Sequence, residues 1–141
     1  MAGYSLELKL KKSFDPKTIM QELHNEVRKG LNAAADLAIE IIEDRTAEGK
    51  GLNGTFKPYS KGYYRFKQKR LGGDMTVNLQ WSGNMLRSMV HTVDDAKATI
   101  FFSSATEAKK AVWNSRLRPF FGLRSSEISE IQTEFNRVVN L

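Results

Sequence analysis

The chain of 141 residues carries 22 basic and 16 acidic residues, two histidines and no cysteine, which gives a net charge of +6. This length suits one domain spanning residues 1–141, and a chain without cysteine has neither disulfides nor thiolate metal sites. No apolar run approaches the roughly 20 residues of a membrane span, and residues 1–5 lack the basic start and apolar centre of a secretory signal. We therefore expect synthesis in the cytoplasm and no contact with a membrane.

The first residues alternate between apolar and polar side chains, which is the period of a strand with one buried face. The apolar positions are Tyr4, Leu6, Leu8 and Leu10. The sequence predicts a short amphipathic strand here.

A long helix is expected next. Asp15 and Pro16 are typical of a helix start, because Asp caps free backbone N–H groups and Pro is tolerated in the first turn. Apolar residues then recur at steps of three and four through Ile42, so one face should meet a core. Gly30 costs about 1 kcal/mol relative to Ala, yet we expect the helix to continue to about Thr46, over roughly 45 Å.

Residues 49–60 are rich in glycine and are expected to form a flexible segment, extended over residues 56–59 because the residue before proline avoids the helical region. Ser60 is expected to cap a second helix. On that helix Tyr63 and Phe66 should pack inward, while the bases at four-residue spacing point outward. These bases are Lys61, Arg65 and Lys69.

Residues 71–74 are expected to end this second helix. Ser82 then suits the cap of a short helix that runs to Met89, and residues 90–93 and 98–102 predict a hairpin of two strands. Residues 105–113 are helix-like and residues 116–123 form a loop. Ser125 begins a last amphipathic helix, whose apolar positions are Ile128, Ile131, Phe135, Val138 and Val139.

The fold class that these elements predict is α+β, with a long N-terminal helix and further helices packed on a small, mainly antiparallel β-sheet.

Carboxylates crowd the end of the long helix, and they offer the first test for an enzyme. They are Glu40, Glu43, Asp44 and Glu48. Neither His24 nor His91 lies near them in sequence, and acids at this spacing usually form a solvated face. We expect no catalytic residues, metal or cofactor. A hydrolase or nuclease that uses Glu40, Glu43 or Asp44 would instead show metal-dependent turnover.

The segment from Phe56 to Arg70 combines aromatic side chains with bases and contains no acid. Its bases are Lys57, Lys61, Arg65, Lys67, Lys69 and Arg70. Lysine and arginine neutralise phosphates while exposed aromatics stack on bases, so these residues are candidates for contact with DNA or with an acidic protein surface. The plainer interpretation is that the aromatics belong to the core and the bases to a solvated rim.

Two adjacent aromatics, Phe120 and Phe121, lie on a loop bounded by Pro119 and Gly122. Adjacent side chains on a short turn are expected to point into different surroundings. One of the two should anchor the last helix, and the other should meet a partner.

Three segments, taken in order, resemble the tail-completion and virion-morphogenesis proteins of tailed bacteriophages. They are Gly54-x-Phe56-x-Pro58-Tyr59-Ser60 with Tyr64 and Lys67, Val77-x-Leu79-x-x-Ser82-Gly83-x-Met85-Leu86-x-Ser88, and Arg118-Pro119-Phe120-Phe121-Gly122-Leu123. The similarity covers about two thirds of the chain. The chain departs from the family in its short link between Leu71 and Val77 and in Trp81 before Ser82.

The resemblance implies a non-enzymatic virion protein at the neck or upper tail, where it would form a hexameric ring that joins a finished tail to a DNA-filled head. Its partners would be other copies of itself, other neck and tail proteins, and the genomic DNA that passes through the lumen. The residues expected at partner or subunit interfaces are Phe56, Pro58, Tyr59, Tyr63, Arg118, Pro119, Phe120 and Phe121. The alternative function is a small basic nucleic-acid-binding module.

Overall fold

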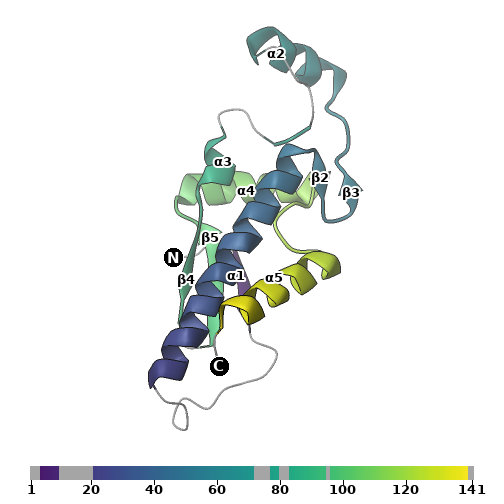
Figure 1. The fold of residues 1–141 in the computed structure, drawn as a ribbon. Helices are drawn as coiled ribbons and strands as arrows, with labels where there is room; N and C mark the ends of the chain where they lie inside the picture. The colour runs from purple at the N-terminus through teal and green to yellow at the C-terminus, as the bar shows by residue number, and fades with distance from the viewer. Residues whose placement is uncertain (1–3, 10–20, 72–76, 80–82, 95, 140–141) are drawn as a thin grey trace.

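A computed structural model describes residues 4–9, 21–71, 77–79, 83–94 and 96–139. The fold is α+β, as predicted: five helices accompany a three-stranded antiparallel sheet and a separate two-stranded hairpin. Figure 1 shows the long first helix running along the sheet, with the last helix beside it. Within the described ranges, no helix is both long and apolar enough to cross a membrane.

The sheet contains β1 (Ser5–Lys9), β5 (Lys97–Phe102) and β4 (Met89–Val93), in that spatial order. Buried and partly buried residues alternate along β5, so Ala98, Ile100 and Phe102 face the core. The β4–β5 turn is closed by Asp94, whose carboxylate accepts hydrogen bonds from the backbone N–H groups of Ala96 and Lys97 at 2.9 and 3.0 Å. The hairpin predicted over residues 90–93 and 98–102 is therefore confirmed, and so is the alternation predicted for the first strand, since Leu6 and Leu8 of β1 are partly buried between exposed neighbours.

Helix α1 (Gln21–Ala47) supplies the other side of the core. Its buried face contains Val27, Leu31 and Ile42 together with the small residues Ala34, Ala35 and Ala38. The helix continues unbroken through Gly30 and ends one residue after Thr46, as predicted. The expected start at Asp15 and Pro16 lies outside the described residues.

Helix α5 (Ser125–Val138) packs against α1 at Gly30. A Cβ at position 30 would lie 2.4 Å from Cγ2 of Val139 and 2.7 Å from the ring of Phe135. Glycine therefore lets the two helices approach closely, although it stabilises a helix less than alanine does. Ile131 is buried beneath α5, whereas Ile128, expected on the apolar face, is exposed.

The loop of residues 118–124 joins the core through a buried ion pair. Arg45 on α1 contacts the carboxylate of Glu127 and donates to the backbone oxygens of Phe120 and Gly122 at 2.6 and 3.1 Å. Burial lowers the pKa of Arg45, and the carboxylate of Glu127 opposes that shift. Three partners thus hold a guanidinium that would be costly to bury alone.

Phe120 and Phe121 are both buried, which corrects the expectation that one of them meets a partner. The ring of Phe121 lies 4.9 Å from the ring of Phe102 and 4.8 Å from that of Tyr4, so it closes one end of the sheet. Phe120 is enclosed completely. Adjacent side chains reach different parts of one core here, because α1, the sheet and the loop surround the turn.

The segment predicted as a flexible stretch contains a hairpin of β2 (Lys50–Gly51) and β3 (Gly54–Thr55). It is joined to the loop of residues 118–124: Leu52 donates its N–H to the oxygen of Pro119 at 2.9 Å, and the Arg124 guanidinium donates to the oxygen of Gly51. Phe56 is buried beside Gly51 and is core, not an exposed interface residue.

Two helices cover the end of the sheet near this hairpin. Helix α3 (Asn84–Arg87) is shorter than predicted because Met89 already belongs to β4, and its cap is Gly83 with a φ of 81°. The cap expected at Ser82 lies outside the described residues. Helix α4 (Ala105–Leu117) extends past the predicted end at residue 113.

Candidate functional site

Helix α2 (Lys61–Leu71) stands apart from the rest of the molecule. Figure 1 shows it beyond the end of α1, connected by the extended residues 57–60, and it has few contacts with any other helix or strand. Its start is as predicted, since the Ser60 hydroxyl accepts the Tyr63 N–H at 3.2 Å. Residues 57–71 are called the arm below, and the rest of the fold is called the body.

The aromatic side chains of α2 are exposed, which corrects the prediction that they pack inward. Tyr63, Tyr64 and Phe66 expose 39%, 41% and 49% of their surface. The physical reason is the position of the helix: α2 does not lie on the body, so no apolar surface is available to cover its aromatic side chains. Soluble proteins rarely expose large apolar patches, and such patches usually mark a surface that binds another molecule.

Among the α2 side chains that the structure describes, at residues 61–70, only Lys67 is buried, so it does not belong with the exposed candidates for DNA contact. Its ammonium donates to Oη of Tyr59 at 3.0 Å and to Oδ1 of Asn78 at 3.4 Å. It also lies 4.9 Å from the centre of the Tyr59 ring, at a distance suited to a cation–π contact. Lys67 therefore joins α2 to Tyr59 within the arm and to Asn78 outside it.

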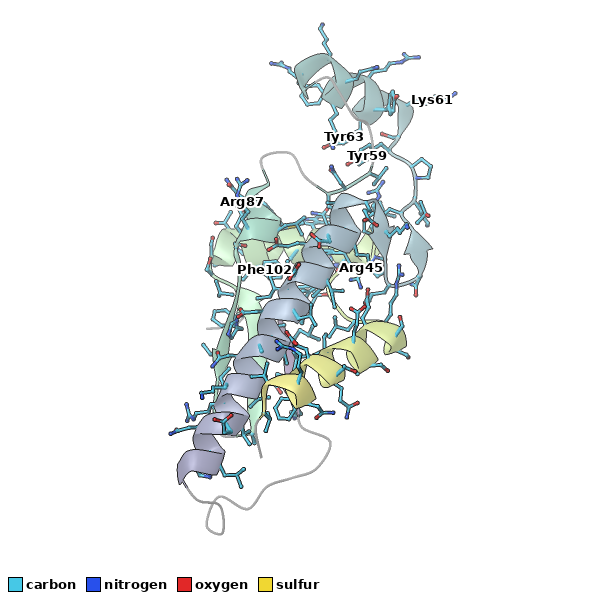
Figure 2. All side chains as sticks on the ribbon, viewed as in Figure 1. Arg45, Tyr59, Lys61, Tyr63, Arg87 and Phe102 are labelled. Carbon is cyan, nitrogen blue, oxygen red and sulfur yellow. The ribbon has the colours of Figure 1, made fainter. Side chains whose placement is uncertain are left out.

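Arg118, at the end of α4, fixes the base of the arm. Its guanidinium donates to the backbone oxygens of Lys57 at 3.0 Å and Pro58 at 3.1 Å, and it lies 5.2 Å from the centre of the Tyr59 ring. Tyr59 also contacts Tyr63 of α2: the centres of the two rings are 4.8 Å apart, in an edge-on arrangement. Figure 2 shows both tyrosines between α2 and the body.

Four of the predicted interface residues are thus brought together, but by contacts within the chain. Pro58, Tyr59, Tyr63 and Arg118 form the base of the arm, and Pro119 accepts a hydrogen bond from the β2–β3 hairpin. A cleft of about 600 Å³ lies beside them. Its walls come from the arm, from the segment around α3 and from α4: Tyr59, Ser60, Tyr63, Leu79, Gly83, Met85, Lys110, Asn114, Leu117 and Arg118.

The remaining bases of α2 point into solvent. Lys61, Arg65, Lys69 and Arg70 are exposed, and none of them has an ion-pair partner among the residues that the structure describes. Figure 2 shows Lys61 on the side of α2 away from the body. Arg70 lies 5.4 Å from the centre of the Phe66 ring. Lys57, before the helix, is also exposed.

Sequence reasoning missed an exposed apolar surface on α4. Trp113 exposes 71% of its surface and Leu117 52%, and the Arg116 guanidinium lies 5.5 Å from the Trp113 ring centre. The signal was present: Ala111 is buried, and a residue two positions later lies about 200° around a helix of 3.6 residues per turn. Trp113 therefore had to face away from the core.

The carboxylates of α1 do not form a metal site in this structure. Among the described residues, no group of three histidine, aspartate or glutamate side chains is arranged to hold a metal ion. Burial raises the pKa of Glu43, and the neighbouring charges of Asp44 and Glu40 raise it further. His91 lies on β4 and contacts α1 away from these carboxylates: its Nδ1 is 3.4 Å from Oδ1 of Asp36, and its Nε2 is 2.9 Å from Oδ1 of Asn32.

Comparisons with protein-family models, with curated proteins and with solved structures find no match to this chain.

Proposed function

We propose that this chain is a structural virion protein of a tailed bacteriophage, located at the neck or upper tail, where copies form a ring that joins tail to head. The observation that carries the proposal is where the three family-like segments lie. Arg118 of the third segment bonds to the backbone just before Tyr59 of the first, and Gly83 and Met85 of the second border the same cleft.

This arrangement explains why the resemblance covers three separate pieces of sequence. They build one structural unit, the base of an arm that carries exposed aromatics and bases away from a complete core. A ring subunit needs two different surfaces that meet head to tail, so that a repeated rotation closes the assembly. A projecting arm on a compact body supplies one such surface, and the neighbour's body supplies the other.

The same resemblance gives the remaining parts of the proposal. The ring has six subunits and lies between other neck and tail proteins, the genomic DNA passes through its lumen, and its role is assembly without chemical turnover. Stable interfaces between subunits bury on the order of 800 Å² on each partner. An arm that carries an 11-residue helix adds to such an area without any change in the core.

Light scattering and negative-stain electron microscopy of the purified protein, alone and mixed with its tails, test this function. Closed rings are expected, alone or on the tail end, and virions that lack the protein should fail to join head and tail. A protein that stays monomeric under all these conditions, or complete virions that assemble without it, would remove the proposal.

A second candidate, a nucleic-acid-binding module, is favoured by one observation: four exposed basic residues lie beside exposed aromatic rings on α2. Phosphate contacts by such bases give binding that weakens steeply with salt, because counterions are released. Binding to single-stranded DNA at 50 mM salt should then disappear by 500 mM. No binding at the lower concentration would dismiss this candidate.

A further inference from the structure

Two rows of opposite charge lie on different helices of this protein at the same spacing. The basic row consists of Lys61, Arg65 and Lys69 on α2, and the acidic row consists of Asp36, Glu40 and Asp44 on α1. We propose that the α2 arm of one copy lies along the α1 acidic row of the next copy. This inference rests on the ring proposed above and names the surfaces that meet in it.

The arm has the properties of a segment that another molecule covers. Isolated helices shorter than about 12–15 residues are marginal in water, and α2 has 11 residues with few contacts to the body. It nevertheless exposes three aromatic rings. A partner that covers one face of α2 would stabilise the helix and remove apolar surface from water at the same time.

The acidic row identifies that partner as a second copy of the chain. Its residues are exposed on the side of α1 opposite the core, and within the described part of the chain neither Glu40 nor Asp44 has a cation within 4 Å. Oδ1 of Asp36 lies 3.4 Å from Nδ1 of His91. Glu43 lies beside the row; burial raises its pKa, and the negative charges of Asp44 and Glu40 raise it further.

The two rows also match in geometry. Residues four apart on a helix are separated by about 6 Å along the axis, so three bases on α2 can face three acids on α1 in one register. The same copy does not make this contact, because its α2 lies beyond the end of α1 (Figure 1). Since the basic and acidic rows are different surfaces, the contact is heterologous and propagates from copy to copy, as a ring requires.

Charge pairs on a protein surface contribute little affinity by themselves, so they are expected mainly to fix the register and orientation of the contact. The exposed rings of Tyr64 and Phe66, next to the basic row, supply apolar area. Aromatic residues of this kind dominate the energetics of many interfaces.

Charge reversal tests the proposal. One variant combines Lys61→Glu with Arg65→Glu, and a second combines Glu40→Lys with Asp44→Lys. Each alone places like charges opposite each other and should weaken self-association at least tenfold. In an equal mixture, the reversed arm of the first variant faces the reversed row of the second, and the native arm of the second faces the native row of the first. Both contacts again join opposite charges, so association should return.

The matched control for the arm variant is Lys109→Glu with Arg137→Glu, which lowers the net charge by the same amount on α4 and α5 and should assemble like the unaltered protein. Circular dichroism confirms that each variant is folded, and light scattering at 100 mM salt measures association.

The outcomes separate this inference from the function on which it rests. In one result, the unaltered protein forms rings and the reversed variants form them too; in another, it forms rings but the mixture of variants fails to associate. Either result would show that the two surfaces named here do not meet, and it would leave the proposed ring intact. If the arm variant loses binding to single-stranded DNA and the mixture stays dissociated, the arm serves nucleic acid. If the unaltered protein never associates, the proposed function fails, and this contact fails with it.

Discussion

The body and the arm use the same kinds of side chain in opposite ways. In the body, Phe120 is fully enclosed and Arg45 is buried against the carboxylate of Glu127. In the arm, Phe66 is half exposed, and the buried cation, Lys67, has a phenol and an amide as partners instead of an acid. Residue type alone therefore does not decide burial in this protein. What decides it is whether the segment has a second layer to pack against.

Replacing Phe120 by Ala should have the largest effect on stability. Truncation of a fully buried phenylalanine costs about 3–5 kcal/mol, because apolar contacts are lost and a cavity remains. Phe66→Ala on the arm is the matched variant and should cost less than about 0.5 kcal/mol. Urea unfolding followed by circular dichroism measures both. Similar losses for the two variants would mean that the arm shares the core.

Arg45→Ala should be the next most damaging change. It removes the partner of a largely buried carboxylate and leaves the oxygens of Phe120 and Gly122 without a donor, at a cost of roughly 3 kcal/mol. Arg118→Ala removes two similar bonds, but at the base of the arm, and should cost less than about 1 kcal/mol of unfolding free energy. The comparison is read from urea midpoints, and a larger loss for Arg118→Ala would contradict the division between the two regions.

Gly30→Ala examines the contact between α1 and α5 within the body. Alanine favours a helix by about 1 kcal/mol over glycine, yet its Cβ would lie within 3 Å of Val139 and Phe135. Overpacking costs about 1–3 kcal/mol, so we expect a net loss of about 1 kcal/mol. Gly62→Ala on the arm meets no atom within 4 Å and should stabilise α2 slightly. Thermal unfolding distinguishes these opposite signs.

Much of the body was predictable because its patterns report burial directly. Alternation in β1 and β5, and the three- and four-residue steps of α1, follow from each element having one face on the core. The role of Gly30 was not predictable, since helix propensity records its cost and only the crossing of α5 shows its benefit.

The arm shows where sequence patterns stop being informative. Tyr63 and Phe66 have the spacing of an inward-facing pair, but periodicity does not say whether anything lies beneath the helix. The burial of Lys67 depends on Tyr59 and Asn78, which lie eight and eleven positions away in the chain. These contacts depend on how the segments before and after α2 pack against it, and no local signal encodes them.

The exposed aromatics of the arm should matter for assembly and hardly at all for folding. Tyr64→Ser with Phe66→Ser is expected to change the unfolding free energy by less than about 0.5 kcal/mol and to weaken self-association strongly. Trp113→Ser, at an even more exposed position on α4, is the control for a general loss of apolar surface. Equal effects of the two changes on light scattering would show that the arm has no special part in assembly.

The smallest effect is expected at Glu43 on α1, beside the acidic row. Its pKa is raised above 4.5 by burial and by the charges of Asp44 and Glu40, so the folded state favours the protonated acid. The stabilisation this gives is present below pH 4.5 and is lost as the pH rises through the folded-state pKa.

Glu43→Gln should therefore raise the stability of the monomer slightly at pH 7, and the difference should vanish in acid. The same change removes a negative charge from beside the acidic row, so self-association at pH 7 should weaken while folding improves. Thermal unfolding between pH 3.5 and 7.5, with Glu130→Gln on α5 as the control, measures the first effect, and light scattering measures the second. A Glu43→Gln variant that gains in both would show that the repulsion on α1 is not relieved by an arm from a neighbouring copy.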